Sequence, residues 1–195
     1  MSFKPWPSCR GTHAFVEAAL ALLKENAIQP SQIERIDVTV SPFFAVLCTP
    51  PEQKRRPKTA IDAKFSIPFT VAIALAYGDV GLRDFSRERL DDPALHALAD
   101  RVEYSVESAW QLDQSTRGAL HLTLADGHHL SREVVDPLGH PRHPMGEAAS
   151  RRKFEDCLAS ARHPLDAAKI RRLAAQLDEL EKVADVRELF AQSTA

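Results

Sequence analysis

The sequence is poor in cysteine, and its three cysteines, Cys9, Cys48 and Cys157, are widely spaced along 195 residues. This spacing argues against a disulfide framework and against a cysteine-based zinc or iron–sulfur site. No pair of histidines has the HExxH spacing, and the sequence has no glycine-rich phosphate loop and no GxSxG nucleophile turn. We therefore expect a protein that needs no bound metal and no cofactor, in a reducing compartment.

The sequence also lacks a basic excess, since 25 Lys and Arg stand against 27 Asp and Glu. Nucleic-acid-binding domains usually carry a clear positive excess, so we expect no nucleic-acid partner. The short basic cluster of Lys54, Arg55 and Arg56 lies beside prolines, and we interpret it as a solvated loop rather than a phosphate-binding surface.

Long apolar runs are absent as well, so the sequence predicts no segment that crosses a bilayer. The first ten residues, MSFKPWPSCR, do not have the apolar stretch of a signal peptide. We expect a soluble, cytoplasmic protein with no membrane partner.

What the sequence does contain is enough apolar material for a core, with 44% hydrophobic residues. Alternation of apolar and polar residues predicts strands at 36–40, 101–107, 120–124 and 129–135. Asp126 and Gly127 are typical of the turn that joins the last two strands. Helical spacing predicts helices at 12–26 and 67–77, capped by Thr12 and Ser66, and short helices at 82–89 and 92–99. Residues 49–59 are expected to form a polar loop.

This order of elements predicts an α+β fold: a two-layer α/β sandwich with antiparallel strands, followed by a C-terminal helical tail. Residues 136–146 are rich in proline and glycine, which indicates a boundary. Amphipathic spacing beyond it predicts one helix around 154–161 and another around 170–180. The apolar faces of these helices would pack either on the sheet or on something that this chain does not contain.

Four residues that can carry chemistry fall close together at the start of the first predicted helix: Lys4, Cys9, Arg10 and His13. Cations beside the first amides of a helix form a good cradle for a carboxylate or a phosphate. A cysteine in such a place is expected to favour its thiolate, and a histidine can exchange a proton near neutral pH. The alternative is a flexible terminal segment with incidental charges.

The segment from Asp62 to Phe69 has a similar character, because Lys64 and Ser66 lie at the opening of the buried helix. Either side chain would reach a bound anion if the two helix starts face each other. The simpler alternative is that Lys64 is a solvated surface residue and that Ser66 only caps the helix.

Three segments resemble the motifs of one known family. Residues 3–14, FKPWPSCRGTHA, resemble the KxYPxCxxTH segment of the MmgE/PrpD family, and residues 62–72, DAKFSIPFTVA, resemble its DxKFSxPYxVA segment. Residues 139–145, followed by Lys153 and Phe154, resemble its late GxPxxPM…KF segment. The family includes 2-methylcitrate dehydratase, cis-aconitate decarboxylase and iminodisuccinate epimerase. The resemblance covers most of this chain but only the C-terminal part of a family member.

The resemblance implies a division into two domains. Residues 1–138 would form the family's small α+β domain, and residues 139–195 would form a linker with C-terminal helices that join the family's helical domain. The site would lie in the cleft between the two domains and would act on small di- or tricarboxylates without a metal.

The resemblance also assigns candidate roles. The candidate catalytic residues are Lys4, Cys9 and His13, and the candidate substrate-binding residues are Arg10, Lys64, Ser66 and Phe69. Lys4 would contact a substrate carboxylate, and Cys9 stands where decarboxylase relatives carry histidine. Phe69 stands where many members carry tyrosine, so a hydroxyl that can act as an acid or as a hydrogen-bond donor is missing.

The function that this implies is that of a lyase portion resembling 2-methylcitrate dehydratase of propionate catabolism. Dehydration needs a base for a carbon-bound proton, an acid for the leaving hydroxide and cations for the carboxylates. The chain offers the cations, and a separate helical-domain polypeptide would supply the rest; we also expect a homodimer or another homo-oligomer. The alternative is a non-catalytic binding or dimerisation module derived from this family.

Overall fold

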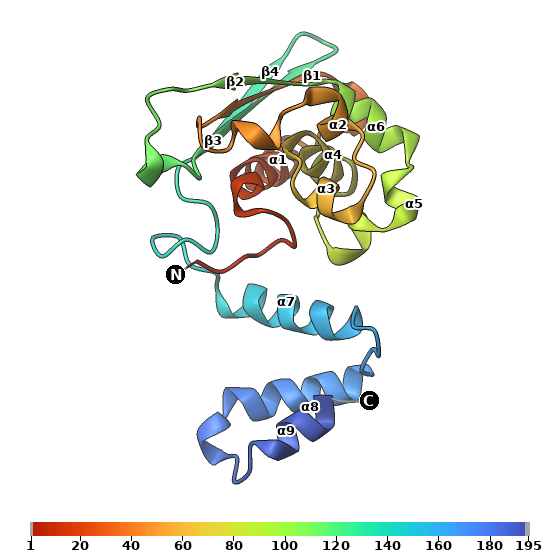
Figure 1. Cartoon of the computed structure of the whole chain (residues 1–195), viewed down its shortest axis with the longest axis vertical. Helices are drawn as coiled ribbons and strands as arrows, with labels where there is room; N and C mark the ends of the chain where they lie inside the picture. Colours follow the sequence, from red (N-terminus) through yellow and green to blue (C-terminus); the bar gives the residue numbers. More distant parts are fainter. Residues whose placement is uncertain (1, 194–195) are drawn as a thin grey trace. The chain divides into compact units, whose positions relative to one another are not determined.

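The computed structural model describes residues 2–193, and the chain divides after Pro144 into two compact units. The first unit holds a four-stranded sheet with helices on one face (Figure 1). The second unit is entirely helical. This agrees with the predicted α+β class and with the predicted helical tail.

The strands of the sheet stand in the order β2-β1-β3-β4. Their bounds are Ile33–Val40 for β1, Val102–Val106 for β2, Gly118–Leu124 for β3 and His129–Val134 for β4. β3 pairs antiparallel with both β1 and β4, and Gly127 turns the β3–β4 hairpin with a φ of 83°. β2, however, pairs parallel with β1, so the sheet is mixed and the expectation of antiparallel strands is wrong for β2. The helices between β1 and β2 form the crossover that a parallel pair requires.

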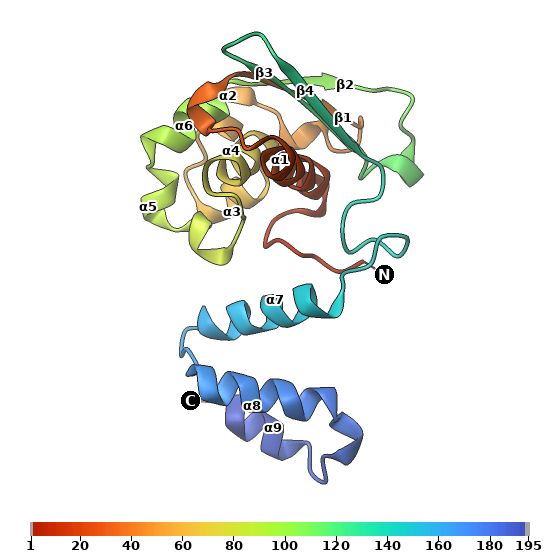
Figure 2. The same cartoon turned by 180° about the vertical axis from the view of Figure 1, so that it is seen from behind.

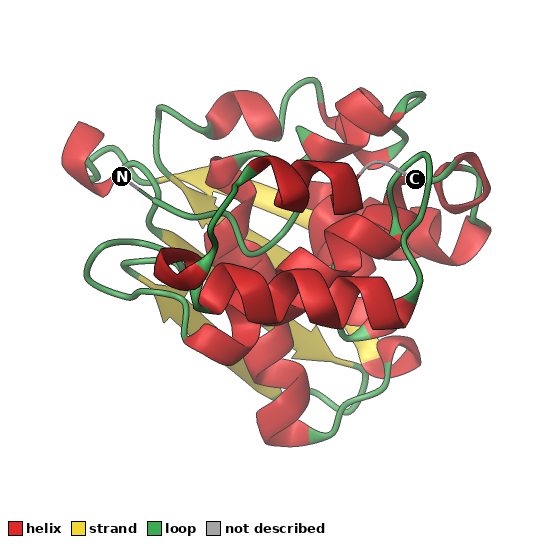
Figure 3. Cartoon of the chain, turned by 90° about the horizontal axis from the view of Figure 1, so that it is seen from below, coloured by secondary structure: helices red, strands yellow, loops and turns green. Residues whose placement is uncertain are grey.

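The helices of the first unit cover the apolar face of the sheet (Figures 1 and 2). Their bounds are His13–Asn26 for α1, Pro51–Arg55 for α2, Ala60–Lys64 for α3, Ile67–Tyr77 for α4, Arg87–Leu90 for α5 and Pro93–Asp100 for α6. α1 packs on β3 and β4, and α4 packs on α1 and α6. Figure 3 shows the chain with its helices in red and its strands in yellow. The core of this unit lies between the two layers.

Short 3-10 turns connect several of these elements. Their bounds are Arg10–Thr12 for η1, Pro30–Gln32 for η2, Ala45–Leu47 for η3, Leu82–Phe85 for η4, Leu112–Gln114 for η5 and Leu180–Lys182 for η6. α2 falls in residues 49–59, which the sequence predicted to be a loop, so that expectation is corrected. The three prolines at 50, 51 and 57 obscured its single helical turn, although proline is well tolerated in a first turn.

The two predicted helix caps have different outcomes. The hydroxyl of Ser66 accepts a hydrogen bond from the Phe69 amide at 3.0 Å, so Ser66 caps α4 as predicted. Gly78 ends the same helix with a φ of 69°. Thr12 does not cap α1, because η1 precedes the helix and the Thr12 hydroxyl donates to the Cys9 carbonyl instead.

The second unit contains α7 (Glu147–Ala159), α8 (Ala167–Asp178) and α9 (Arg187–Ser193). A small core of its own forms around four buried side chains: Leu165, Ile170, Leu173 and Leu189. Phe154 and Leu158 of α7 pack against this core. Among the described residues of the whole chain, no helix has the length and apolarity needed to cross a membrane.

Candidate functional site

The first and second family-like segments, residues 3–14 and 62–72, are joined through their main chains. The Cys9 amide donates a hydrogen bond to the Lys64 carbonyl oxygen at 2.8 Å. The hydroxyls of Ser8 and Thr12, both buried, lie 2.7 Å apart and close the turn between Cys9 and α1. The two helix starts that the sequence singled out therefore lie next to each other.

The third family-like segment, which begins at Gly139, is joined to the first. The Phe3 amide donates to the Gly139 carbonyl oxygen at 2.9 Å. Gly139 has a φ of 85°, and a Cβ at this position would lie 2.2 Å from the Phe3 carbonyl oxygen. Only glycine satisfies both the left-handed backbone and this close approach. The first two segments and the start of the third, residues 139–144, are remote in sequence and thus form one connected part of the first unit.

Arg10 is held by several acceptors of the protein itself. Its guanidinium donates to the carbonyl oxygens of Pro137 and Leu138, both at 2.8 Å. The Leu138 amide in turn donates to the Glu17 carboxylate at 2.6 Å. Burial lowers the pKa of the half-buried Arg10, and the nearby Glu17 carboxylate opposes that effect. Arg10 is therefore bound to protein acceptors on the approach to the third segment, and its predicted contact with a substrate remains a prediction.

His13 is fully buried at the first residue of α1. Its Nδ1 lies 3.0 Å from Nη1 of Arg10, and because a guanidinium only donates, Nδ1 is the acceptor. The neutral imidazole therefore carries its proton on Nε2. The ring also meets the indole of Trp6 edge-on, with centroids 5.3 Å apart and an interplanar angle of 82°. Its catalytic role remains a prediction.

The remaining predicted residues differ in their access to solvent. Lys4 is exposed, Cys9 is partly exposed, and the Lys64 ammonium lies 5.4 Å from the centre of the Phe85 ring. Ser66 is buried, and besides capping α4 its hydroxyl donates to the Lys54 carbonyl oxygen at 2.5 Å.

Phe69 is completely buried, with its ring 6.5 Å from that of His96. Among the candidate residues of the first segment, Lys4 is thus exposed, Cys9 and Arg10 are partly exposed, and His13 is buried. The roles predicted for Ser66 and Phe69 in substrate binding remain predictions.

Comparison with known proteins gives two findings. Residues 6–179 match the model of the MmgE/PrpD C-terminal domain. The chain belongs to the MmgE/PrpD family. A cis-aconitate decarboxylase-like protein of Aspergillus oryzae, oryM, is 30% identical over 189 residues, which cover 93% of this chain and 38% of that protein. The chain therefore spans well under half the length of this relative.

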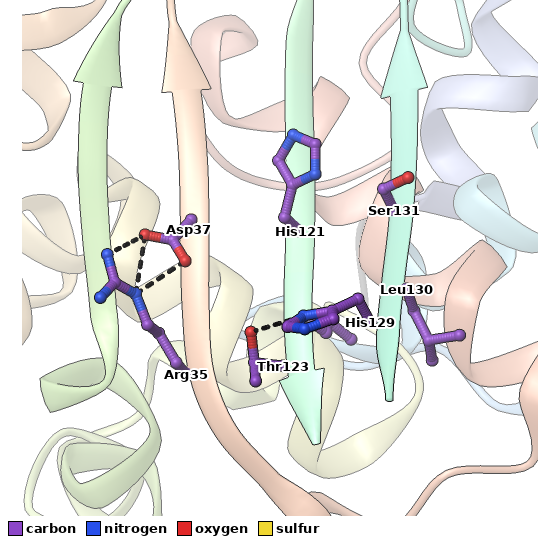
Figure 4. Close-up of a pocket in the computed structure, with 8 residues that line it drawn as sticks. Arg35, Asp37, His121, Thr123, His129, Leu130 and Ser131 are labelled. Carbon is purple, nitrogen blue, oxygen red and sulfur yellow. Dashed lines mark hydrogen bonds and ion pairs between the residues drawn. The ribbon is translucent and has the colours of Figure 1, made fainter. Parts of the chain in front are cut away.

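The open face of the sheet in this MmgE/PrpD domain carries a shallow pocket of about 520 Å³ (Figure 4). Arg35 and Asp37 of β1 stand on one side, and the Arg35 guanidinium is held by the Asp37 carboxylate at 2.6–3.0 Å. His129 of β4 lies 3.2 Å from the Thr123 hydroxyl of β3. The charged side chains here are thus paired with each other, and no predicted site residue lines this pocket.

The contacts of this MmgE/PrpD domain include site-supporting residues that the sequence reasoning missed. Glu17 fixes the loop before the third segment, and its position four residues after His13 on one helix face was the available signal. The Lys54 ammonium donates a hydrogen bond to the Phe65 carbonyl oxygen, and the Lys54 carbonyl oxygen accepts one from the Ser66 hydroxyl. Nothing in the local sequence of Lys54 indicated that role. Among residues 2–193, no group of three or more His, Cys, Asp or Glu side chains is placed to hold a metal ion.

Proposed function

We propose that this MmgE/PrpD domain provides the carboxylate-binding wall of a cytoplasmic lyase that dehydrates a small di- or tricarboxylate of the 2-methylcitrate type. The observation that carries the proposal is the joining of all three family-like segments by hydrogen bonds. The Cys9–Lys64 and Phe3–Gly139 bonds bring together residues that are remote in sequence. A connected wall of this kind holds its cations in fixed places, as differential binding of a charged transition state requires.

In the proposed reaction a base removes a proton from the carbon next to a carboxylate, and the C–O bond to the hydroxyl breaks. An acid protonates the departing hydroxide, so the products are an unsaturated acid and water. Lys4, exposed and cationic, would bind a substrate carboxylate. Cys9 would face the reacting carbons, and the buried His13, with Arg10 on its Nδ1, would hold its proton on Nε2. The base that takes the carbon-bound proton would come from a helical partner domain.

Dehydration by a mixture of proteins tests this proposal. The chain is combined with a separately produced helical domain of the family, and conversion of 2-methylcitrate is followed by the ultraviolet absorbance of the unsaturated product. We expect activity in the mixture and a loss of at least about tenfold on Lys4→Ala, since one charged contact to a carboxylate is removed. Lys24→Ala, an exposed lysine near the end of α1, is the matched control. An inactive mixture whose two proteins also fail to co-purify contradicts the proposal.

The second candidate is a non-catalytic binding or dimerisation module of a homo-oligomer. Phe69 favours it, because the residue lacks the tyrosine hydroxyl of many family members and is completely buried. This function predicts that residues 147–195 hold an assembly together. A deletion of 147–195 that leaves solubility and oligomeric state unchanged would count against it.

A further inference from the structure

A second pocket lies in the first unit, around α2 and the loop that follows it. Its volume is about 430 Å³, and most of the residues that line it have polar or charged side chains: Thr49, Pro50, Glu52, Gln53, Lys54, Arg56, Lys58 and Asp62. This is the proline-rich basic stretch that the sequence suggested was only a solvated loop. None of the seven predicted site residues lines it.

The fold sorts the basic side chains of this stretch into two groups. Lys54, Arg56 and Lys58, at alternate positions, all line the pocket. Arg55 points elsewhere, because its guanidinium donates to the Val102 carbonyl oxygen at 2.6 Å and to the Glu103 carboxylate at 2.7 Å. The pocket therefore collects three cations from five consecutive residues.

The carboxylates near these cations neutralise them only in part. Asp62 accepts hydrogen bonds from the amide and the hydroxyl of Thr59, at 3.1 and 2.7 Å, and so caps α3. Arg56 is paired with Asp100. Among the ion pairs of the described residues, none involves Lys54, Lys58 or Glu52, the remaining carboxylate of the lining. The lining therefore holds three cations, Lys54, Arg56 and Lys58, against two carboxylates, Glu52 and Asp62.

We propose that this pocket binds a small polyanion, with two or more anionic groups carried on one molecule as in a diphosphate or a tricarboxylate. Several cations within a concave surface favour a ligand whose charges are spread over more than one group. The inference does not depend on the proposed lyase activity, because none of the seven candidate site residues lines the pocket.

Lys54 connects the pocket to the start of α4. Its ammonium donates to the Phe65 carbonyl oxygen at 2.8 Å, and its own carbonyl oxygen accepts the hydrogen bond of the Ser66 hydroxyl. A bound anion competes with the Phe65 carbonyl for the Lys54 ammonium. Occupation of the pocket therefore changes the surroundings of the amide that follows that carbonyl, the Ser66 amide.

Calorimetric titration of the full chain with inorganic pyrophosphate and, separately, with citrate tests the proposal. We expect saturable binding that weakens as salt is added, since the contacts are solvent-exposed charges. Binding that Lys58→Ala weakens and Glu52→Gln strengthens supports the proposal, and the anion that binds in this way, pyrophosphate or citrate, identifies the class of anionic group. In a nuclear magnetic resonance titration, the Ser66 amide should shift together with the amides of residues 52–58.

Three variants distinguish binding in this pocket from a general electrostatic attraction of anions to the protein. Lys58→Ala should weaken binding about fivefold, the effect of one charge at contact distance in water. Glu52→Gln should strengthen binding by about threefold, a gain that loss of folding cannot produce. Lys24→Ala should leave affinity unchanged. The proposal is overturned if neither anion saturates, or if Lys58→Ala and Glu52→Gln both bind like the unaltered chain.

Discussion

The Nη1 atom of Arg10 lies 2.8 Å from the carbonyl oxygen of Leu138, and its Nη2 lies equally close to the carbonyl oxygen of Pro137. A single side chain at the start of the first helical turn thus satisfies two consecutive carbonyls on the approach to the third family-like segment. The same guanidinium fixes the Nδ1 atom of His13 as an acceptor. Arg10 therefore both holds the loop before the third segment and determines which ring nitrogen of His13, a candidate catalytic residue, carries the proton.

Replacement of Arg10 by glutamine should destabilise the first unit. The change removes charge-assisted hydrogen bonds to two carbonyls, and we expect a loss of about 2 kcal/mol in the free energy of unfolding. Arg10→Lys should recover only part of it, because an ammonium does not reproduce the fork of a guanidinium. Urea denaturation gives the measurement, and Arg83→Gln, at an exposed side chain, is the control. A denaturation midpoint for Arg10→Gln equal to that of the control would refute this role.

Alanine at Gly139 should cost more stability than alanine at Gly127. Both glycines have nearly the same positive φ, 85° and 83°, so the backbone strain of about 1 kcal/mol is shared. Only at Gly139 would the new Cβ meet another group, the Phe3 carbonyl oxygen at 2.2 Å. Thermal unfolding measures the difference, and amide exchange should show faster exchange of Phe3 only in Gly139→Ala. Equal losses in the two variants would mean that the Phe3 contact is unimportant.

Alanine at Ser66 should destabilise the fold by about 1–2 kcal/mol, because α4 loses its cap and the Lys54 carbonyl loses its donor. Ser86 offers a matched comparison, since it caps the short α5 with a hydrogen bond of 3.4 Å at an exposed position. We expect Ser86→Ala to stay within about 0.5 kcal/mol of the unaltered chain. Chemical denaturation measures the free energy of unfolding of both variants. Similar losses of stability in Ser66→Ala and Ser86→Ala would contradict the prediction.

The loop that contains the third segment should respond to pH through Asp136. The Arg142 guanidinium, with His140 and His143 nearby, holds the pKa of Asp136 below its ordinary value of 3.8. A lowered carboxyl pKa gives stability that is present above the unfolded-state pKa and is lost as pH falls through the folded-state pKa. Arg142→Gln should move the pKa of Asp136 back toward 3.8.

Carboxyl-carbon resonance titration measures the pKa of Asp136 directly in both proteins. The stability difference between the two, measured in urea, should be largest near neutral pH and should shrink as the solution is acidified below about pH 4. If the stability difference between the two proteins stays constant down to the pH where Asp136 is protonated, the Asp136–Arg142 ion pair is not its cause.

The prediction of the fold from sequence succeeded where periodicity carried the information. Residues 67–77 are apolar on every side, and α4 is indeed buried around its circumference. The direction of β2 was not predictable in the same way, because Val102–Val106 has the same alternation whether its neighbour is parallel or antiparallel. Pairing direction depends on the path of the crossover, which is a property of the whole chain rather than of five residues.

The candidate site shows a similar limit. The sequence singled out the residues around Cys9 and Lys64 as two helix starts and left open whether they face each other, and the structure shows that their main chains meet. It did not predict that Arg10 turns toward the Leu138 carbonyl, because no local signal marks a free carbonyl 128 residues away. That the predicted residues act on a substrate remains a prediction.

The hydrogen bond between Cys9 and Lys64 uses only main-chain atoms. This joint therefore does not depend on the chemistry of the side chain at position 9, although proline, which has no amide hydrogen, would break it. Substitutions at position 9 can therefore test the candidate catalytic role of Cys9 while this joint is kept. Directed evolution at this one codon is accordingly a rational route to new chemistry.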